Sequence, residues 1–332
     1  MGGRRREKVR RSKRQKWVRF FEESAELRGV DVLTEFCLAK LNLFLAITGK
    51  RPDGFHDLVS VAAPLDFGDT LTVEPAHKGG FSLTCDDPAV PTDESNLVLR
   101  AARLWADAAG WTQGATFHLS KRVPMGAGLG GGSSDATGAL RALNKLSGGI
   151  LTEAELQVIA AEVGSDCPLF LRSGPVVMRG WGELLSELPE NARRRLVGRR
   201  VLVFKPAFGI STVWAYRALT AAREGYLPTE QAEKRLSDWV DDEEAEAEKL
   251  GFNSMEREAF RKYGALPVML KWLWEEHRLQ ARMSGSGSAC YVWLRKDVDE
   301  AAVTTGIFDR WGKSTMVKQG CILDALTLNS MQ

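Results

Sequence analysis

The chain has 332 residues, of which 44% are hydrophobic and 27% charged, and this composition excludes a disordered or collagen-like protein. It contains no run of about 18 apolar residues, the length that a membrane-spanning helix needs, and its first 20 residues are too basic and polar for a secretory signal. Its five cysteines are widely spaced and never form a C-x-x-C pair, which indicates neither a disulfide framework nor a zinc site. We therefore expect a cytoplasmic protein with no membrane partner.

The net charge of +2 conceals an asymmetry between the N-terminus and the remainder of the chain. Residues 1–20 carry ten Lys or Arg and one acid, whereas the rest carries 35 basic and 42 acidic groups. Such a basic run could bind nucleic acid or an anionic surface, but it equally fits a solvated extension or a start site placed too far upstream. We predict a flexible N-terminal extension over residues 1–30 and expect no nucleic-acid partner.

Apolar periodicity predicts a mixed α/β organisation from residue 31 onward. Alternation predicts strands at residues 38–47, 59–65 and 115–119, and helical spacing predicts helices at residues 96–109, 136–146 and 152–163. The turn residues Pro52, Asp53 and Gly54 join the first two strands, so we expect a hairpin there. Thr152 and Glu155 have the spacing of a capping box, which places a helix start at this position.

The Arg-rich stretch 191–200 reads as a surface linker, and we place a domain boundary near residue 195. Strand character resumes at residues 201–204, and residues 289–294 form a buried-strand candidate. Residues 238–248 carry seven acids, which predicts a solvated helix face or loop; a metal site is the less favoured alternative.

The most informative segment runs from Pro124 to Ala136 and has five glycines in the seven positions 126–132. Glycines in this density, before a helix, suit a turn whose N–H groups and helix N-terminus converge on an anion. The alternative is a flexible loop in which Ser133 or Ser134 caps the helix. Five glycines exceed what capping requires, so we predict a phosphate-binding loop.

Other phosphate-binding motifs fit this segment poorly. Gly126-x-Gly128-x-x-Gly131 matches the dinucleotide fingerprint in form, but the acid expected about 20 residues later falls in a predicted helix start. A P-loop requires a Lys directly after its glycines, and none follows here. We therefore set both motifs aside.

The segment 124–136 resembles the phosphate-binding motif of the GHMP small-molecule kinases. Further blocks in the family's order lie at residues 39–43, 51–56, 164–168, 253–256 and 283–287, so the resemblance covers about residues 36–325. The Lys-Leu-Asn block and the Asp-Gly-Phe-His turn resemble the branch of the family that acts on methylerythritol linked to cytidine diphosphate.

The resemblance implies an α/β (α+β) two-domain fold, with domains at 31–195 and 196–332 and an active site in the cleft between them. It implies ATP-dependent phosphorylation, with Mg²⁺, of the 2-hydroxyl of that small-molecule substrate in the non-mevalonate isoprenoid pathway. Two alternatives remain: a GHMP kinase of the homoserine or mevalonate type, or a nucleotide-binding module without catalysis. The oligomeric state stays open.

Two charged residues are candidates for the chemistry. Lys40 lies inside an apolar strand pattern, where an unpaired ammonium would be costly, so it needs an anionic partner or a cleft, unless it extends from a strand edge to solvent. Asp166 is a carboxylate among small and apolar neighbours and could otherwise cap a helix. The resemblance makes Asp166 the catalytic base and Lys40 its partner.

The resemblance also assigns binding roles. It implies that the ATP phosphates are bound by Pro124, Gly126, Gly128, Leu129, Gly130, Gly131, Gly132, Ser133 and Ser134. It implies that the substrate is bound by Asn42, Phe55, His56, Thr212 and Tyr216. Position 55 is more often Tyr in the family, a change that preserves stacking on cytosine but loses the hydroxyl. Trp214 is the rival to Tyr216 as the second aromatic wall, and Asn96 is either a helix cap or a nucleotide contact. No acidic magnesium ligand stands out, so phosphates, water and a loop hydroxyl would hold the metal.

Overall fold

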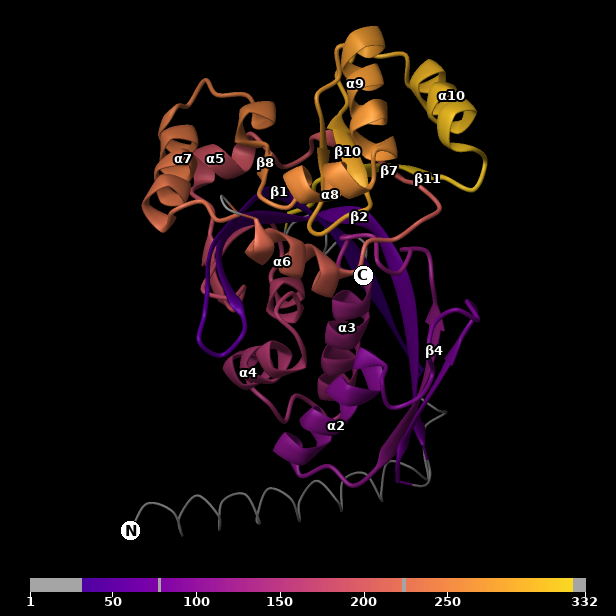
Figure 1. The fold of residues 1–332 in the computed structure, drawn as a ribbon. Coiled ribbons are helices and arrows are strands. Elements are labelled where there is room, and N and C mark those ends of the chain that lie inside the picture. The colour runs from indigo at the N-terminus through magenta and orange to yellow at the C-terminus, as the bar shows by residue number, and fades with distance from the viewer. Residues whose placement is uncertain (1–31, 77–78, 223–224, 325–332) are drawn as a thin grey trace.

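A computed structural model of the chain describes residues 32–76, 79–222 and 225–324, arranged as two sheets with helices packed against them (Figure 1). The predicted extension at residues 1–30 lies outside this part. No helix among the described residues is long and apolar enough to cross a bilayer.

The larger sheet has the strand order β3-β4-β2-β1-β8, with β5 on β2 and β6 on β5. Its strands are β1 (Leu33–Lys50), β2 (His56–Ala76), β3 (Phe81–Cys85), β4 (Gly114–Ser120), β5 (Val176–Arg179), β6 (Leu184–Glu187) and β8 (Phe252–Asn253). The smaller sheet has the order β11-β7-β10-β9, with strands β7 (Arg200–Lys205), β9 (Ala281–Met283), β10 (Cys290–Trp293) and β11 (Met316–Cys321).

Helices lie at both ends of the molecule in the view of Figure 1. Those that precede β7 in the chain are α2 (Leu97–Ala109), α3 (Gly131–Leu146), α4 (Glu153–Val163), the 3₁₀ turn η1 (Cys167–Leu171) and α5 (Glu190–Arg194). Those that follow β7 are α6 (Thr212–Ala221), α7 (Thr229–Asp241), η2 (Ala247–Leu250), α8 (Glu256–Lys262), α9 (Ala265–His277) and α10 (Glu300–Trp311). Helix α5 lies beside α7 at the upper end, and α6 lies near the middle (Figure 1).

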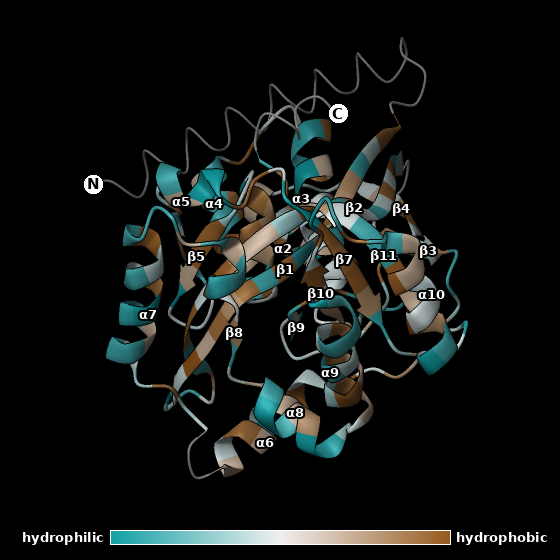
Figure 2. Ribbon diagram, turned by 90° about the horizontal axis from the view of Figure 1, so that it is seen from above, coloured by the Kyte–Doolittle hydropathy of each residue, from teal (hydrophilic) through white to brown (hydrophobic). Residues whose placement is uncertain are grey.

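Three hydrophobic cores hold these layers together. One lies between the larger sheet and α2, α3 and α4, and a second packs α6, α8, α9 and α10 against the smaller sheet and against residues of β1, β2 and β5. The third also joins both sheets, because Leu41 of β1, Val203 of β7 and Trp239 of α7 belong to the same buried cluster. Figure 2 shows the matching pattern: the central strands are largely hydrophobic, and hydrophilic residues concentrate on outer helices such as α7.

The predicted hairpin and the Thr152 capping box are confirmed. The hairpin turn closes with the Arg51 N–H donating to the Phe55 carbonyl (2.8 Å), and β1 and β2 extend well beyond the predicted segments. At α4, the Thr152 hydroxyl accepts from the Glu155 N–H while the Glu155 carboxylate accepts from the Thr152 N–H. The strand predicted at 289–294 is β10, and all four of its residues are buried.

The prediction of an Arg-rich surface linker at 191–200 is wrong. Residues 190–194 form α5, and the Arg195 guanidinium lies 4.1 Å from the Trp239 ring centre. Its N–H groups donate to the carbonyls of Trp239, Val240, Asp242 and Ala245, so it caps the C-terminal end of α7. The sequence shows the positive charge of this Arg-rich stretch, but it does not show that Arg195 packs on the ring of Trp239, 44 residues away.

The acidic run at 238–248 covers the end of α7, a loop and η2, and its carboxylates are mostly exposed. The described residues contain no group of three or more His, Cys, Asp or Glu placed to hold a metal. The division near residue 195 stays a prediction, since β7 starts a new sheet there but β8 returns to pair with β1.

Candidate active site

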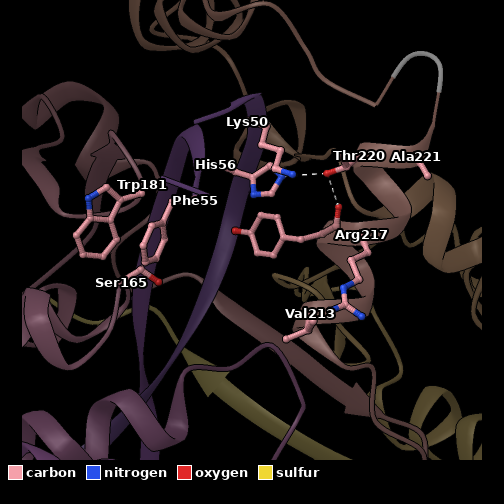
Figure 3. Close-up of a pocket in the computed structure, with 11 residues that line it drawn as sticks. Lys50, Phe55, His56, Ser165, Trp181, Val213, Arg217, Thr220 and Ala221 are labelled. Atoms are coloured by element: carbon pink, nitrogen blue, oxygen red, sulfur yellow. Dashed lines mark hydrogen bonds between the residues drawn. The ribbon is translucent and has the colours of Figure 1, made fainter. Parts of the chain in front are cut away.

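Two cavities lie side by side, and they share the lining residues Ser165 and Tyr216. The first, of about 560 Å³, which we call the aromatic cavity, is lined by Lys50, Gly54, Phe55, His56, Ser165, Trp181, Val213, Tyr216, Arg217, Thr220 and Ala221 (Figure 3). The second, of about 290 Å³, is the glycine-loop cavity, lined chiefly by residues 124–133, by Lys40 and Asn42 of β1, and by Asp166, Thr212, Gly285 and Ser286.

Lys40 and Asp166 face one another in the glycine-loop cavity. The Lys40 Nζ lies 3.5 Å from the Asp166 Oδ2, and the Lys40 side chain is 4% exposed against 34% for Asp166. Asp166 stands at the N-terminus of η1 but makes no capping hydrogen bond with its side chain. Its carboxylate is therefore not used to cap the start of η1 and can interact with a ligand in the cavity.

Asn42 fixes the position of the Lys40 ammonium. Residues two apart on a strand share a face, and the Lys40 Nζ donates a hydrogen bond to the Asn42 Oδ1. The Asn42 Nδ2 donates to the Ser60 Oγ on β2 (3.0 Å), and the Ser60 hydroxyl donates to the Phe44 carbonyl (2.6 Å). This series of hydrogen bonds restricts the Lys40 side chain and favours a single orientation of its ammonium toward Asp166.

The glycine-rich loop lies close to the backbone of residues 284–289, the segment that joins β9 to β10. Gly126, Gly128 and Gly130 have positive φ angles, and a Cβ on Gly128 would lie 2.1 Å from the Ser284 carbonyl oxygen. The Ser284 hydroxyl accepts from the Asn42 N–H (3.1 Å) and donates to the Gly128 carbonyl (2.9 Å). One buried serine thus ties the loop to the strand that carries Lys40.

Helix α3 starts directly after the loop and offers free N–H groups to the glycine-loop cavity. Its N-cap is Gly130, which has no side chain to satisfy them, and the first turn contains no acid. Such a helix end attracts anions through its N–H groups and its dipole. The arrangement therefore suits a phosphate chain.

A buried ion cluster lies beneath this helix end. The Lys121 Nζ contacts the Asp69 Oδ2 (2.5 Å) and the Asp135 Oδ2 (2.9 Å), and all three side chains are at most 6% exposed. Burial raises the pKa of Asp135 to about 7, although the Lys121 charge opposes the shift. The Asp135 Oδ1 has no hydrogen-bond partner among the described atoms, so ionisation of this carboxyl is costly.

We predict that Asp135→Asn flattens the pH dependence of stability. The pKa of Asp135 is raised from 3.8, so its stabilising contribution is present at low pH and is lost as pH rises from about 4 through about 7. When the pH is raised from about 5.5 to about 8.5, the temperature of the unfolding midpoint should decrease more for wild type than for the variant. Asp86→Asn is the control, because hydrogen bonding lowers the pKa of Asp86 and keeps it ionised over this range. If the unfolding midpoints of wild type and Asp135→Asn changed with pH in parallel, the raised pKa of Asp135 would be contradicted.

Two pairs of rings form the walls of the aromatic cavity (Figure 3). The Phe55 and Trp181 rings are tilted, with centroids 5.1 Å apart, and the His56 and Tyr216 rings are stacked at 4.7 Å. Phe55 is 52% exposed, unusual for a large apolar side chain. Planar apolar walls of this kind suit a planar ligand.

Hydrogen bonds around Thr220 determine the tautomer of His56. The Thr220 hydroxyl donates to the Tyr216 carbonyl (2.9 Å) and accepts from the Tyr226 hydroxyl (2.9 Å). The His56 Nε2, 3.1 Å from the Thr220 Oγ1, must therefore donate. Burial and the nearby Lys50 charge lower the pKa of His56, so at neutral pH the ring is uncharged and Nδ1 is an acceptor.

The structure brings most of the predicted site residues to these cavities. Thr212 lies in the glycine-loop cavity, where its hydroxyl is 2.9 Å from the Ser286 Oγ, and not in the aromatic cavity. Tyr216 lines both cavities, whereas its rival Trp214 packs edge-on against Tyr263 at 5.4 Å and lines neither.

Two predicted residues lie elsewhere. Ser134 is 1% exposed, within the first turn of α3, and Ser133 instead lines the cavity. Helix α3 begins at Gly131, so neither serine is its N-cap. Asn96 caps α2 by accepting from the Val98 N–H (2.9 Å), and it lines neither cavity.

Sequence reasoning missed several lining residues, above all Trp181 and Arg217. Trp181 stands between Gly180 and Gly182, which both have positive φ, and this Gly-Trp-Gly pattern is the signal that could have drawn attention to it. Arg217 directly follows Tyr216 but carries no pattern of its own.

Comparisons with known proteins place the chain in a family. Residues 96–174 match the family described as GHMP kinases N terminal domain, and residues 238–310 match GHMP kinases C terminal. A 4-diphosphocytidyl-2-C-methyl-D-erythritol kinase from Protochlamydia amoebophila (strain UWE25) is 38% identical over 77% of this chain and 82% of its own length. The enzyme of the same name from Burkholderia lata (strain ATCC 17760) is 36% identical over 83% and 90%.

Solved structures agree with this placement. A crystal structure of 4-(cytidine 5'-diphospho)-2C-methyl-D-erythritol kinase has a TM-score of 0.67 and 32% identity, and the match covers 87% of this chain and 99% of that one. A homoserine kinase from Cytophaga hutchinsonii has a TM-score of 0.68 at 17% identity, covering 89% and 96%, which shows a common fold alone.

Proposed function

Because this chain belongs to the 4-diphosphocytidyl-2-C-methyl-D-erythritol kinase family of GHMP kinases, we propose that it transfers the γ-phosphoryl group of ATP to the 2-hydroxyl of 4-diphosphocytidyl-2-C-methyl-D-erythritol. The observation that carries the proposal is the place of the Lys40–Asp166 pair. It lies in the glycine-loop cavity, which meets the aromatic cavity at Ser165 and Tyr216. One substrate could therefore bind its base in one cavity and present its hydroxyl in the other.

The pair supplies what phosphoryl transfer to an alcohol requires. The hydroxyl oxygen forms a bond to the γ-phosphorus as the bond to the leaving ADP oxygen breaks, and the hydroxyl proton passes to the Asp166 carboxylate. The Lys40 ammonium, 3.5 Å from Asp166 and held by Asn42, stabilises negative charge on the reacting oxygens. Asp166 and Lys40 thus orient the hydroxyl and receive its proton.

The glycine-loop cavity is the proposed site of the ATP phosphates. Positive-φ glycines, and a helix N-terminus without a capping side chain, provide donors for a phosphate chain. Mg²⁺ fits there as an ion carried by the nucleotide: Ser133 and Asp166 are oxygen donors that line the cavity, and no larger ligand set exists among the described residues. When bound, the ion neutralises phosphate charge.

The aromatic cavity is the proposed site of cytosine. Phe55 and Tyr216 provide ring faces for stacking, each contributing about 1–3 kcal/mol in base-binding proteins. The free Nδ1 of neutral His56 accepts a hydrogen bond, and the exocyclic amino group of cytosine donates one. Uracil carries an acceptor at that position, so the tautomer of His56 favours cytosine.

We predict that Phe55→Ala combined with His56→Ala raises the KM for the cytidylyl substrate by at least about tenfold, since it removes one stacking face and one base hydrogen bond. The KM for ATP should change less than twofold. The measurement is steady-state ATP consumption with each substrate varied in turn. An unchanged KM for the cytidylyl substrate would show that the base binds elsewhere and favour a kinase for a simpler alcohol.

A further inference from the structure

The aromatic cavity carries a charge that a pyrimidine base does not need. None of its 11 lining residues is acidic, and two of them, Lys50 and Arg217, are cations. Neither forms an ion pair with a carboxylate within residues 32–76, 79–222 and 225–324, whereas cations such as Arg179 and Arg199 do. Cytosine is neutral, so this charge fits an anionic part of the ligand.

Arg217 belongs to the face of α6 that forms one side of the cavity. The lining residues of this helix have the spacing of a single helical stripe: Val213, Tyr216, Arg217, Thr220 and Ala221. Arg217 is exposed and follows Tyr216, whose ring contributes to both cavities. Its guanidinium is thus presented to the cavity by a helix already fixed by Tyr216 and Thr220.

The position of Arg217 relative to the two cavities sets it apart from Lys50. In Figure 3 the Arg217 guanidinium lies on the same side of His56 as Ser165 and Val213, and Lys50 lies beyond His56 on the other side. Ser165 marks the junction with the glycine-loop cavity. A ligand that reaches from the base site to the Lys40–Asp166 pair must pass this junction.

We propose that Arg217 binds the diphosphate that links cytidine to the alcohol. A guanidinium presents paired N–H donors that match two phosphate oxygens at once, and an unpaired Arg at a cavity wall is free to do so. The inference rests on the proposed function, because it takes cytidine as the occupant of the aromatic cavity. It makes Arg217 the residue that distinguishes a cytidine diphosphate from the bare nucleoside.

The test compares nucleoside and nucleotide affinity in wild type, Arg217→Gln, Arg217→Lys and Lys50→Gln. Calorimetric titrations use cytidine and CDP, with the ATP site saturated by ADP and Mg²⁺. Wild type should bind CDP more tightly than cytidine, and Arg217→Gln should weaken CDP binding by about tenfold to a hundredfold while cytidine changes less than twofold. Arg217→Lys should recover part of the loss, and Lys50→Gln should lose less than Arg217→Gln.

The unchanged cytidine affinity of Arg217→Gln also shows that the variant is folded. If Arg217→Gln bound both cytidine and CDP like wild type, the role of Arg217 would be refuted and the proposed function would stand. A loss of CDP affinity confined to Lys50→Gln would refute it in the same way. If wild type bound neither ligand, the cytidine site itself would fail and this inference with it.

Discussion

Replacing Asp166 with Asn is expected to lower kcat by about 10²–10⁴-fold, the range typical of a lost proton-transfer group. The substitution keeps the size of the side chain but removes the carboxylate, 3.5 Å from the Lys40 ammonium, that accepts the proton of the substrate hydroxyl. The KM values for ATP and for the cytidylyl substrate should stay within about threefold, because the predicted role lies in the transition state. Steady-state kinetics with both substrates measure this split.

Two controls accompany Asp166→Asn. The unfolding transition should stay cooperative, which shows that the variant folds, but its midpoint should fall, because the Lys40 side chain, 4% exposed, loses its anionic partner and keeps its hydrogen bond to Asn42. Lys40→Met should also reduce kcat, because it removes the ammonium that Asn42 holds in place. An Asp166→Asn enzyme with near wild-type turnover would refute both a proton-accepting and an orienting role.

Replacing Gly128 with Ala is expected to abolish measurable saturation by ATP. The residue has φ +76°, and a Cβ there would lie 2.1 Å from the Ser284 carbonyl oxygen and 3.0 Å from the Gly287 nitrogen. Both neighbours are backbone atoms that cannot rotate away, so the loop must move and its N–H groups no longer converge. Titration with ATP and Mg²⁺, together with thermal unfolding, measures the loss of affinity and of stability.

Gly149→Ala is the matched control for Gly128→Ala. Gly149 has φ +79°, nearly the same backbone conformation, but no atom lies within 4 Å of a Cβ placed there. It should cost about 1–2 kcal/mol of stability from backbone strain and leave ATP binding intact. If both variants bound ATP alike, the close approach of the loop to Ser284 would have no role in the site.

The sequence predicted those parts of the fold that local patterns determine. The capping box at Thr152 and the turn at Pro52–Gly54 depend on neighbours within a few residues, and both are present. The role of Arg195 depends on a ring far away in the sequence, and β8 joins the larger sheet from the second half of the chain. The hydrophobic periodicity of a sequence does not show which residues far apart in the chain will be in contact.

The same distinction holds for the candidate site. The glycine-rich loop is visible because several unusual backbone conformations lie close together in the sequence. An unpaired Lys40 ammonium would be costly inside an apolar strand, and in the structure Asp166 is the anionic partner that offsets this cost. Trp181 and Arg217 act only through their position across a cavity, and the buried Ser134 shows that a motif residue need not face the ligand.

The most direct test of the proposed kinase activity is ATP consumption by the purified protein with Mg²⁺ and one of three alcohols: 4-diphosphocytidyl-2-C-methyl-D-erythritol, homoserine or mevalonate. We expect turnover with the cytidylyl substrate alone, because only that substrate would occupy both cavities. Turnover of homoserine or mevalonate in its place, or ATP binding without turnover of any of the three, would contradict it.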